Sequence, residues 1–398
     1  MGAQTARSDK TKRNLLIAGI ACLVVGFVAW AMILTQGMLG NTGLNNGFVW
    51  GLFIGVFAFF VGFGAGSQLV YSYIVLSGRK ELAPLAKAAI ALTLGCGAAA
   101  GVAIMIDLGN LGHIMAMLIG TNMASPLAWD MYALSAFLLV ALLEYISIVA
   151  DWGATKVLAG IGVVTAIALQ IIEGLLFSLQ SAHAWWATPI MPIDFLMVAF
   201  VSGFALILLV AWAKGVDEAL PRLGKLLAVF IAIHLVLALC EFGMLFIEGT
   251  AAAGAILQVL GSLWWLYGAE LVLPLVAAIL LFRAGKDVTR KTAIIASAIT
   301  IVGLFAHRLM LLFPAYNTPS LWTGISNMDS ATWGYPISTG MYANGGNTFA
   351  VTAGYVPAPM EWLGILLPLG CALMIFVILW AIADKVAEKK GQASEIAN

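Results

Sequence analysis

Long apolar stretches alternate with short polar segments along almost the whole chain. Ten stretches reach about 20 residues, the length that an α-helix needs to cross roughly 30 Å of hydrocarbon. Their approximate bounds are 14–36, 48–76, 86–107, 126–150, 156–181, 189–213, 222–248, 255–283, 290–313 and 359–384. The pattern predicts an all-α, polytopic integral membrane protein with about ten transmembrane helices packed in helical bundles.

Composition agrees with this class. Hydrophobic residues make up 62% of the chain and charged residues 10%, which excludes a soluble globular domain. The four cysteines, at positions 22, 96, 240 and 371, all fall within predicted spans and form no CxxC motif. They are typical of small packing residues, so the sequence indicates neither a disulfide framework nor a cysteine-ligated metal.

Basic residues predict the orientation of the helices. If the first helix starts inside, the inner segments hold every Lys and Arg except Arg308, which is 18 of the 19 basic residues. Short loops of membrane proteins carry such an excess of Lys and Arg on the cytoplasmic side. We therefore predict a multi-pass protein of the cell (inner) membrane with both termini cytoplasmic.

A single membrane domain is expected over residues 14–384, between a basic tail at 1–13 and a second tail at 385–398. A signal peptide is the alternative for the first helix. The apolar run of this helix, however, is longer than the about 7–15 residues that are usual for the hydrophobic region of a signal peptide. Outer loops are expected at 108–125, 182–188 and 314–358. The last of these has no Lys or Arg and many aromatics, which favours an ordered cap or a docking surface.

Ionisable side chains within the spans gather in the outer half. Each is a functional candidate, because a charge inside a membrane span costs a few kcal/mol unless it is paired or hydrated. The proton-transfer candidates are Asp130, Glu173, Asp194, His234, Glu241 and Arg308. A structural alternative stays open, in which Asp130 complements a helix dipole and Arg308 forms an ion pair whatever the function.

The segment from Asp107 to Tyr132 is polar and rich in glycine, and it connects two long apolar runs. Ser125 and Pro126 suit a helix start. Trp129 and Tyr132 share a helix face, whereas Asp130 points roughly the other way. A lipid-soluble molecule that exchanges protons fits such a segment, and a quinone is one, because its carbonyl oxygens need donors. The predicted quinone-binding residues are His113, Tyr132, Trp129, Gln68 and Asp107.

Two interpretations apply to the glycine-rich second span, where Gly62 to Gly66 precede Gln68. Tight helix packing is one, and space for a flat ligand is the other. Haem is not indicated, since only His234 and His307 lie well inside spans. Electrons would then pass to or from another subunit.

Several motifs, in order, resemble the NrfD/PsrC family of polysulfide reductase-like membrane subunits. These are WGLFIGVFAFFVGFGAGS at 50–67, DLG at 107–109, SPLAWDMY at 125–132, HAWWATPIMPIDFLMVAFVSGFAL at 183–206, Arg308 and YVPAPMEW at 355–362. The chain looks similar to the longer ten-helix branch, which includes hydrogenase and sulfur-metabolism membrane subunits. It departs from that branch at Ala65, where a His is frequent, and at His113, where an Arg is common.

This resemblance implies a subunit that is not catalytic alone and that uses quinone or menaquinone as an exchangeable substrate. It implies no haem or iron–sulfur cluster in this chain and no nucleic acid. The implied partners are a ferredoxin-like iron–sulfur subunit on the outer (periplasmic) face and, through it, a molybdopterin or hydrogenase catalytic subunit.

The leading hypothesis is therefore a membrane anchor of a respiratory oxidoreductase that exchanges electrons between menaquinone and an outer iron–sulfur subunit, with proton transfer. The alternative is a proton-coupled secondary transporter. No pair of Gly/Pro-interrupted spans occurs in corresponding halves, which disfavours the transporter. A third hypothesis is a purely structural anchor. The terminal substrate and the direction of electron flow stay open.

Overall fold

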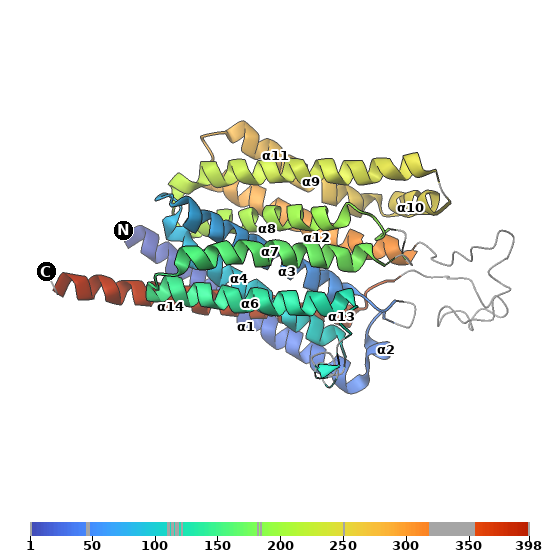
Figure 1. Cartoon of the computed structure of the whole chain (residues 1–398), viewed down its shortest axis with the longest axis horizontal. Helices are drawn as coiled ribbons and strands as arrows, with labels where there is room; N and C mark the ends of the chain where they lie inside the picture. Colours follow the sequence, from blue (N-terminus) through green and yellow to red (C-terminus); the bar gives the residue numbers. More distant parts are fainter. Residues whose placement is uncertain are drawn as a thin grey trace.

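The computed structural model describes residues 2–44, 48–109, 112, 115, 119–120, 122–180, 183, 185–249, 251–317 and 355–396, and most of these residues lie in helices. Within these ranges, ten helices are long and apolar enough to cross a membrane. The predicted all-α, ten-span architecture is thus confirmed (Figure 1).

The spanning helices follow one another along the chain in alternating directions. Their bounds are α1 Gly2–Gln36, α2 Met38–Asn41, α3 Leu52–Ser77, α4 Ala86–Asp107, α6 Pro126–Ala150, α7 Thr155–Ser178, α8 Met191–Lys214, α9 Leu220–Glu248, α10 Ala251–Ser262, α11 Trp264–Ala284, α12 Arg290–Asn317, α13 Pro359–Gly364 and α14 Leu366–Ile396. Two 3₁₀ turns, Ala83–Leu85 and Asp217–Ala219, lead into α4 and α9.

The structure places both termini at one end of the bundle (Figure 1). We call this end, where α3, α8 and α11 finish, the termini end, and the opposite end, where they begin, the far end. α1 and α14 extend beyond the apolar runs, so the described parts of the two predicted tails continue these helices.

The predicted eighth span, 255–283, is divided in the structure. Its first part belongs to α10, a short helix at the far end, and the span itself is α11, which begins only at Trp264. The helix breaks after Gly261 and Ser262, both weak helix formers, and two exposed tryptophans follow. Hydropathy alone does not show this boundary, because α10 is as apolar as a span.

α3 forms the centre of the bundle, in contact with α4, α7, α8 and α12. Its closest approach is to α8 through glycine on both helices. A Cβ atom built on Gly66 would lie 1.9 Å from the Ala199 carbonyl oxygen, and one built on Gly203 would lie 2.2 Å from the Gly66 carbonyl carbon. The two backbones therefore touch, which confirms tight packing at Gly66 and leaves no space there for a ligand.

At the far end, one carboxylate fastens the segment that precedes α13. Glu361 accepts hydrogen bonds from the Gly43 N–H (2.7 Å), the Ala358 N–H (2.8 Å) and the Tyr355 hydroxyl. The Tyr355 oxygen in turn accepts from the Leu52 N–H at 2.6 Å. Burial and the neighbouring Glu361 charge raise the pKa of Tyr355 far above its usual value, so the phenol stays protonated.

The glycine contact between α3 and α8 gives a stability prediction. Gly203→Ala places a methyl group within 2.2 Å of the Gly66 backbone, and overpacking of this kind costs about 1–3 kcal/mol. We expect a lower unfolding midpoint in detergent. Gly101→Ala in α4 is the control, because nothing lies within 4 Å of a Cβ atom placed on that residue. Equal midpoints for the two variants would contradict the contact.

Candidate functional site

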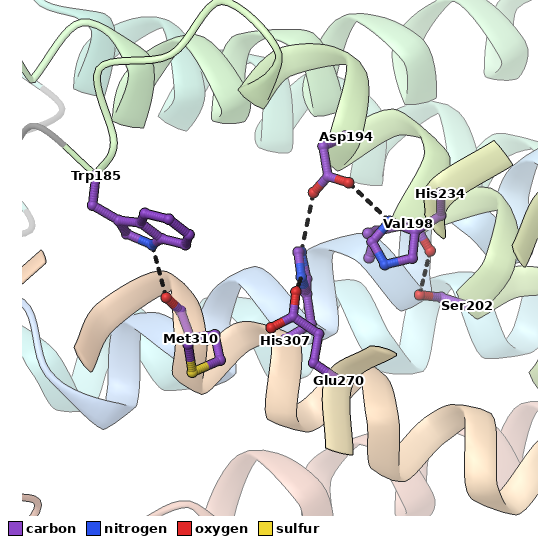
Figure 2. Close-up of polar contacts among 8 residues, drawn as sticks. All are labelled: Trp185, Asp194, Val198, Ser202, His234, Glu270, His307 and Met310. Atoms are coloured by element: carbon purple, nitrogen blue, oxygen red, sulfur yellow. Dashed lines mark hydrogen bonds and ion pairs between the residues drawn. The ribbon is translucent and has the colours of Figure 1, made fainter. Parts of the chain in front are cut away.

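Four ionisable side chains from four helices meet inside the far half of the bundle. Asp194 lies in the first turn of α8, His234 in α9, Glu270 in α11 and His307 in α12. The Asp194 carboxylate contacts His234 Nδ1 at 2.8 Å and His307 Nε2 at 3.1 Å, and Glu270 contacts His307 Nδ1 at 2.8 Å. Figure 2 shows these contacts. We call these four residues the carboxylate–histidine cluster.

The members of the cluster are buried and pair with one another, although His234 Nε2 and one Glu270 oxygen have no hydrogen-bond partner among the described residues. His234 is fully buried, and Asp194 and Glu270 are nearly so. Buried charges are tolerated only when they are paired and hydrogen-bonded. Since His307 has a carboxylate at each ring nitrogen, the charged ring can donate to both acids at once. The arrangement can hold a proton and pass it between neighbouring groups.

The loop before α8 is fixed to α12, and this contact holds two members of the cluster in register. Pro314 lacks an N–H, so the carbonyl of Met310, four residues earlier, loses its helical donor. The Trp185 indole N–H donates to that carbonyl at 2.8 Å (Figure 2), and Trp186 donates to the Leu311 carbonyl at 2.5 Å. His183 contacts the Ala315 carbonyl at 3.2 Å, and burial lowers the pKa of its imidazole.

Two neighbouring cavities lead from the cluster to the far end. The first, which we call the cluster pocket, has an empty volume of about 370 Å³ and is lined by Asp194, Glu270, His307, Glu241 and Tyr267, among others. The second, the α10 pocket, has an empty volume of about 470 Å³ and is lined by Glu248, Thr188 and Ile256 of α10. Glu241 and Trp185 line both cavities.

A buried arginine lies between the cluster and two further acids. The Arg308 side chain is 1% exposed, its guanidinium stacks 4.1 Å from the Phe195 ring centroid, and it lies against Gly62, where a Cβ would come within 3.3 Å of Nη2. Its charge is attracted by Glu173 as well as by Asp194 and Glu270. None of the three guanidinium nitrogens has a hydrogen-bond partner and no ion pair to Arg308 occurs among the described residues, so the expected ion pair is not formed there, and its charge acts on these acids at longer range.

The acids on the other side of Arg308 belong to α6 and α7. Glu173 is fully buried and accepts a hydrogen bond from Gln170 at 3.1 Å. Asp130, which is 2% exposed, is near enough to act electrostatically on Glu173. The structure thus brings the six predicted proton-transfer residues into one buried region, and their roles stay predictions.

Glu270 and His307 were not among the predicted site residues, although both are part of the cluster. Each was visible in the sequence as an ionisable group in a span. Which of these groups share a neighbour depends on the rotation of α11 and α12, and neither helix has a marked amphipathic pattern to show it.

The described members of the predicted quinone-binding set, Gln68, Asp107, Trp129 and Tyr132, lie in different parts of the bundle. His113 lies outside the described residues. Gln68 comes 16 residues after Leu52, which is about 24 Å along α3, and it donates to Glu144 at 2.9 Å toward the termini end. Asp107 lies at the far end, within electrostatic reach of Glu361.

The other two members, Trp129 and Tyr132, face outward. They are 51% and 40% exposed, and the Trp129 indole donates to the Met123 carbonyl at 2.9 Å. Asp130 points into the bundle, so the expected separation of these faces of α6 is confirmed.

Gln68 and Glu144 form a second buried polar pair. Gln68 also donates to Ser72 at 3.3 Å, and α7 makes room for the pair at Gly162, where a Cβ would lie 2.1 Å from Gln68 Nε2. In the described part of the chain, no group of three or more His, Cys, Asp or Glu side chains is arranged to hold a metal ion.

Comparison with known proteins gives three relatives that align over most of their length. A putative dimethyl sulfoxide reductase membrane subunit of Halobacterium salinarum is 27% identical over 84% of this chain and 85% of its own. A selenate reductase subunit of Mesobacillus selenatarsenatis is 24% identical over 89% and 90%. The Hdr-like menaquinol oxidoreductase integral membrane subunit of Archaeoglobus fulgidus is 23% identical over 92% and 91%.

A family model also matches most of the chain. The model described as polysulphide reductase, NrfD matches residues 40–320, which include α3 to α12 and every residue of the carboxylate–histidine cluster. The chain therefore belongs to the NrfD family of integral, multi-pass membrane proteins.

Proposed function

We propose that this chain is the quinone-reactive membrane subunit of a respiratory oxidoreductase complex, and that it exchanges electrons between menaquinone and an iron–sulfur subunit at its far end. The named relatives support this proposal, since they include membrane subunits of reductases and of a menaquinol oxidoreductase. The observation that carries it is the carboxylate–histidine cluster at the wall of a cavity in the far half of the bundle.

The lining of the cluster pocket suits a quinone ring in its chemistry. The Tyr267 hydroxyl is a donor for a carbonyl oxygen, and Glu270, one oxygen of which has no hydrogen-bond partner among the described residues, is an acceptor for a hydroxyl group of a quinol. Reduction of a quinone consumes two protons, and the acids beside the ring position hold and exchange them.

Glu241 connects this pocket with the far surface. It lines both cavities, and Glu248 follows it seven residues later on α9, about 10 Å along the helix. Glu248 is exposed at the end of that helix. Protons released or taken up at the cluster reach water through these two carboxyl groups.

The far end faces outward in this proposal. Every described basic residue except Arg308 lies at or near the termini end, which is the cytoplasmic side by the positive-inside rule. The cluster then lies close to the outer face, where a partner with iron–sulfur clusters, and a catalytic subunit beyond it, can approach the quinone.

Asp194→Asn is the first test. The change removes the negative charge that both histidines share, so we expect quinol-linked electron transfer in the assembled complex to fall by about 10²-fold or more, the usual contribution of a positioned acid or base. Partner subunits should still co-purify.

Glu218→Gln is the matched control, because this acid is exposed at the termini end. If the Asp194→Asn complex turned over at a rate within twofold of the unmodified complex, the carboxylate–histidine cluster would have no part in the mechanism.

Glu241→Gln separates proton exchange from quinone binding. We expect turnover to fall about tenfold or more while a fluorescent quinol-site inhibitor is still quenched with unchanged affinity, since Glu241 borders the pocket without bonding to the cluster. If Glu241→Gln instead lost inhibitor binding while bound quinol was still turned over at the unchanged rate, the role of Glu241 in proton exchange would be contradicted.

Cysteine labelling tests the orientation. In a background without Cys22, Cys96, Cys240 and Cys371, we expect Glu248→Cys to react with a membrane-impermeant maleimide in intact cells. Glu218→Cys should react only after permeabilisation. The reverse pattern would place the far end in the cytoplasm and reject the outer partner.

A further inference from the structure

Two lysines and a tryptophan converge at the termini end, away from the proposed quinone site. Lys12 of α1 and Lys214 of α8 approach the same carboxylate, Asp384 of α14, with N–O distances of 2.5 and 3.7 Å. Both ammonium groups also lie over the indole ring of Trp380, one turn earlier on α14, at 5.1 and 5.2 Å from its centroid. We call these four residues the lysine–tryptophan site.

Positive charge exceeds negative charge around this site. Lys87, at the start of α4, is near enough to repel the charge of Lys214, and Asp9 lies 3.7 Å from Lys12. Three ammonium groups thus meet two carboxylates, and the Asp9 side chain is 70% exposed. The Lys12 and Lys214 side chains are each only 16% exposed, so water screens their repulsion less than at an open surface.

Trp380 adds a hydrogen-bond donor without an acceptor. Its side chain is fully buried, and its indole N–H has no hydrogen-bond partner among the described residues. The indole nitrogen can only donate, and a buried donor without an acceptor is costly. Two cations and a buried N–H group without an acceptor thus occur together at this site, and a phosphate group accepts hydrogen bonds from groups of both kinds.

The site lies at the depth of lipid headgroups. α8 ends at Lys214, the apolar run of α1 begins just after Lys12, and that of α14 ends near Asp384. Lysines at this depth attract anionic lipids. Beyond Lys12, Ile17, Ile20 and Val24 are 60%, 48% and 59% exposed on α1 and offer an apolar surface for an acyl chain.

We propose that the lysine–tryptophan site binds the phosphate group of an anionic phospholipid, whose acyl chains lie along α1. The lipid neutralises the excess charge of Lys12, Lys87 and Lys214 and so fastens the inward ends of α1, α8 and α14 together. This binding is independent of the quinone chemistry at the far end.

Native mass spectrometry of the full chain in detergent tests the proposal, with phosphatidylglycerol and phosphatidylcholine as probes. We expect one phosphatidylglycerol to be retained, and Lys12→Gln/Lys214→Gln to weaken its retention about tenfold or more. Lys80→Gln/Lys291→Gln is the charge-matched control, because both lysines are exposed at the same end; it should retain the lipid. Equal retention by the two double variants would overturn the site.

Two further variants decide the matter if the glutamine pair does not fold. Lys12→Arg/Lys214→Arg keeps both charges and should retain phosphatidylglycerol, whereas Trp380→Phe removes the indole N–H and should weaken retention several-fold. Retention unchanged in Trp380→Phe and lost in the arginine pair would contradict the proposal. A thermal shift with inorganic phosphate equal to that with phosphatidylglycerol would identify free phosphate as the occupant and reject the lipid.

Discussion

A single carboxylate shared by two imidazole rings makes the polar interior of this bundle tolerable. Asp194 carries a charge into a region of apolar helices, and it does so next to His234 on one side and His307 on the other. The pairing works because α8 lies between α9 and α12, and α8 can take that place because its glycine surface lets it touch α3. Buried ion pairs contribute little to stability by themselves. A network of them inside membrane helices is therefore more readily explained by function.

The polar side chains in the described core form three separate groups rather than one. The carboxylate–histidine cluster lies in the far half, Arg308 with Glu173 and Asp130 lies beside it, and Gln68 with Glu144 lies toward the termini end. Glycine creates space beside two of these three groups of residues, with Gly62 against Arg308 and Gly162 against the Gln68–Glu144 pair. The bundle therefore accommodates its charges by omitting side chains opposite them.

The sequence was informative about helices and about which ionisable groups lie in the interior, because both follow from the cost of polar atoms in hydrocarbon. Asp130 points inward while Trp129 and Tyr132 face outward, as helical periodicity predicts. The sequence was less informative about which side chains of different helices contact one another. Glu270 and His307 lie on helices that are apolar around most of their circumference, so nothing local fixes their rotation. Gln68 was predicted beside the outer segment, but its depth along α3 separates it from that segment, and the apolar α10 concealed the true start of α11.

The hydrogen bonds of Trp185 and Trp186 near Pro314 also connect the surface at the far end with the interior of the bundle. Trp185 and Trp186 join the loop ahead of α8 to the last turns of α12, on the same two helices that carry Asp194 and His307. The loop ahead of α8 and the end of α12 thus form one hydrogen-bonded surface at the far end, so whatever contacts this surface lies directly above the helices that hold the acid and the imidazole.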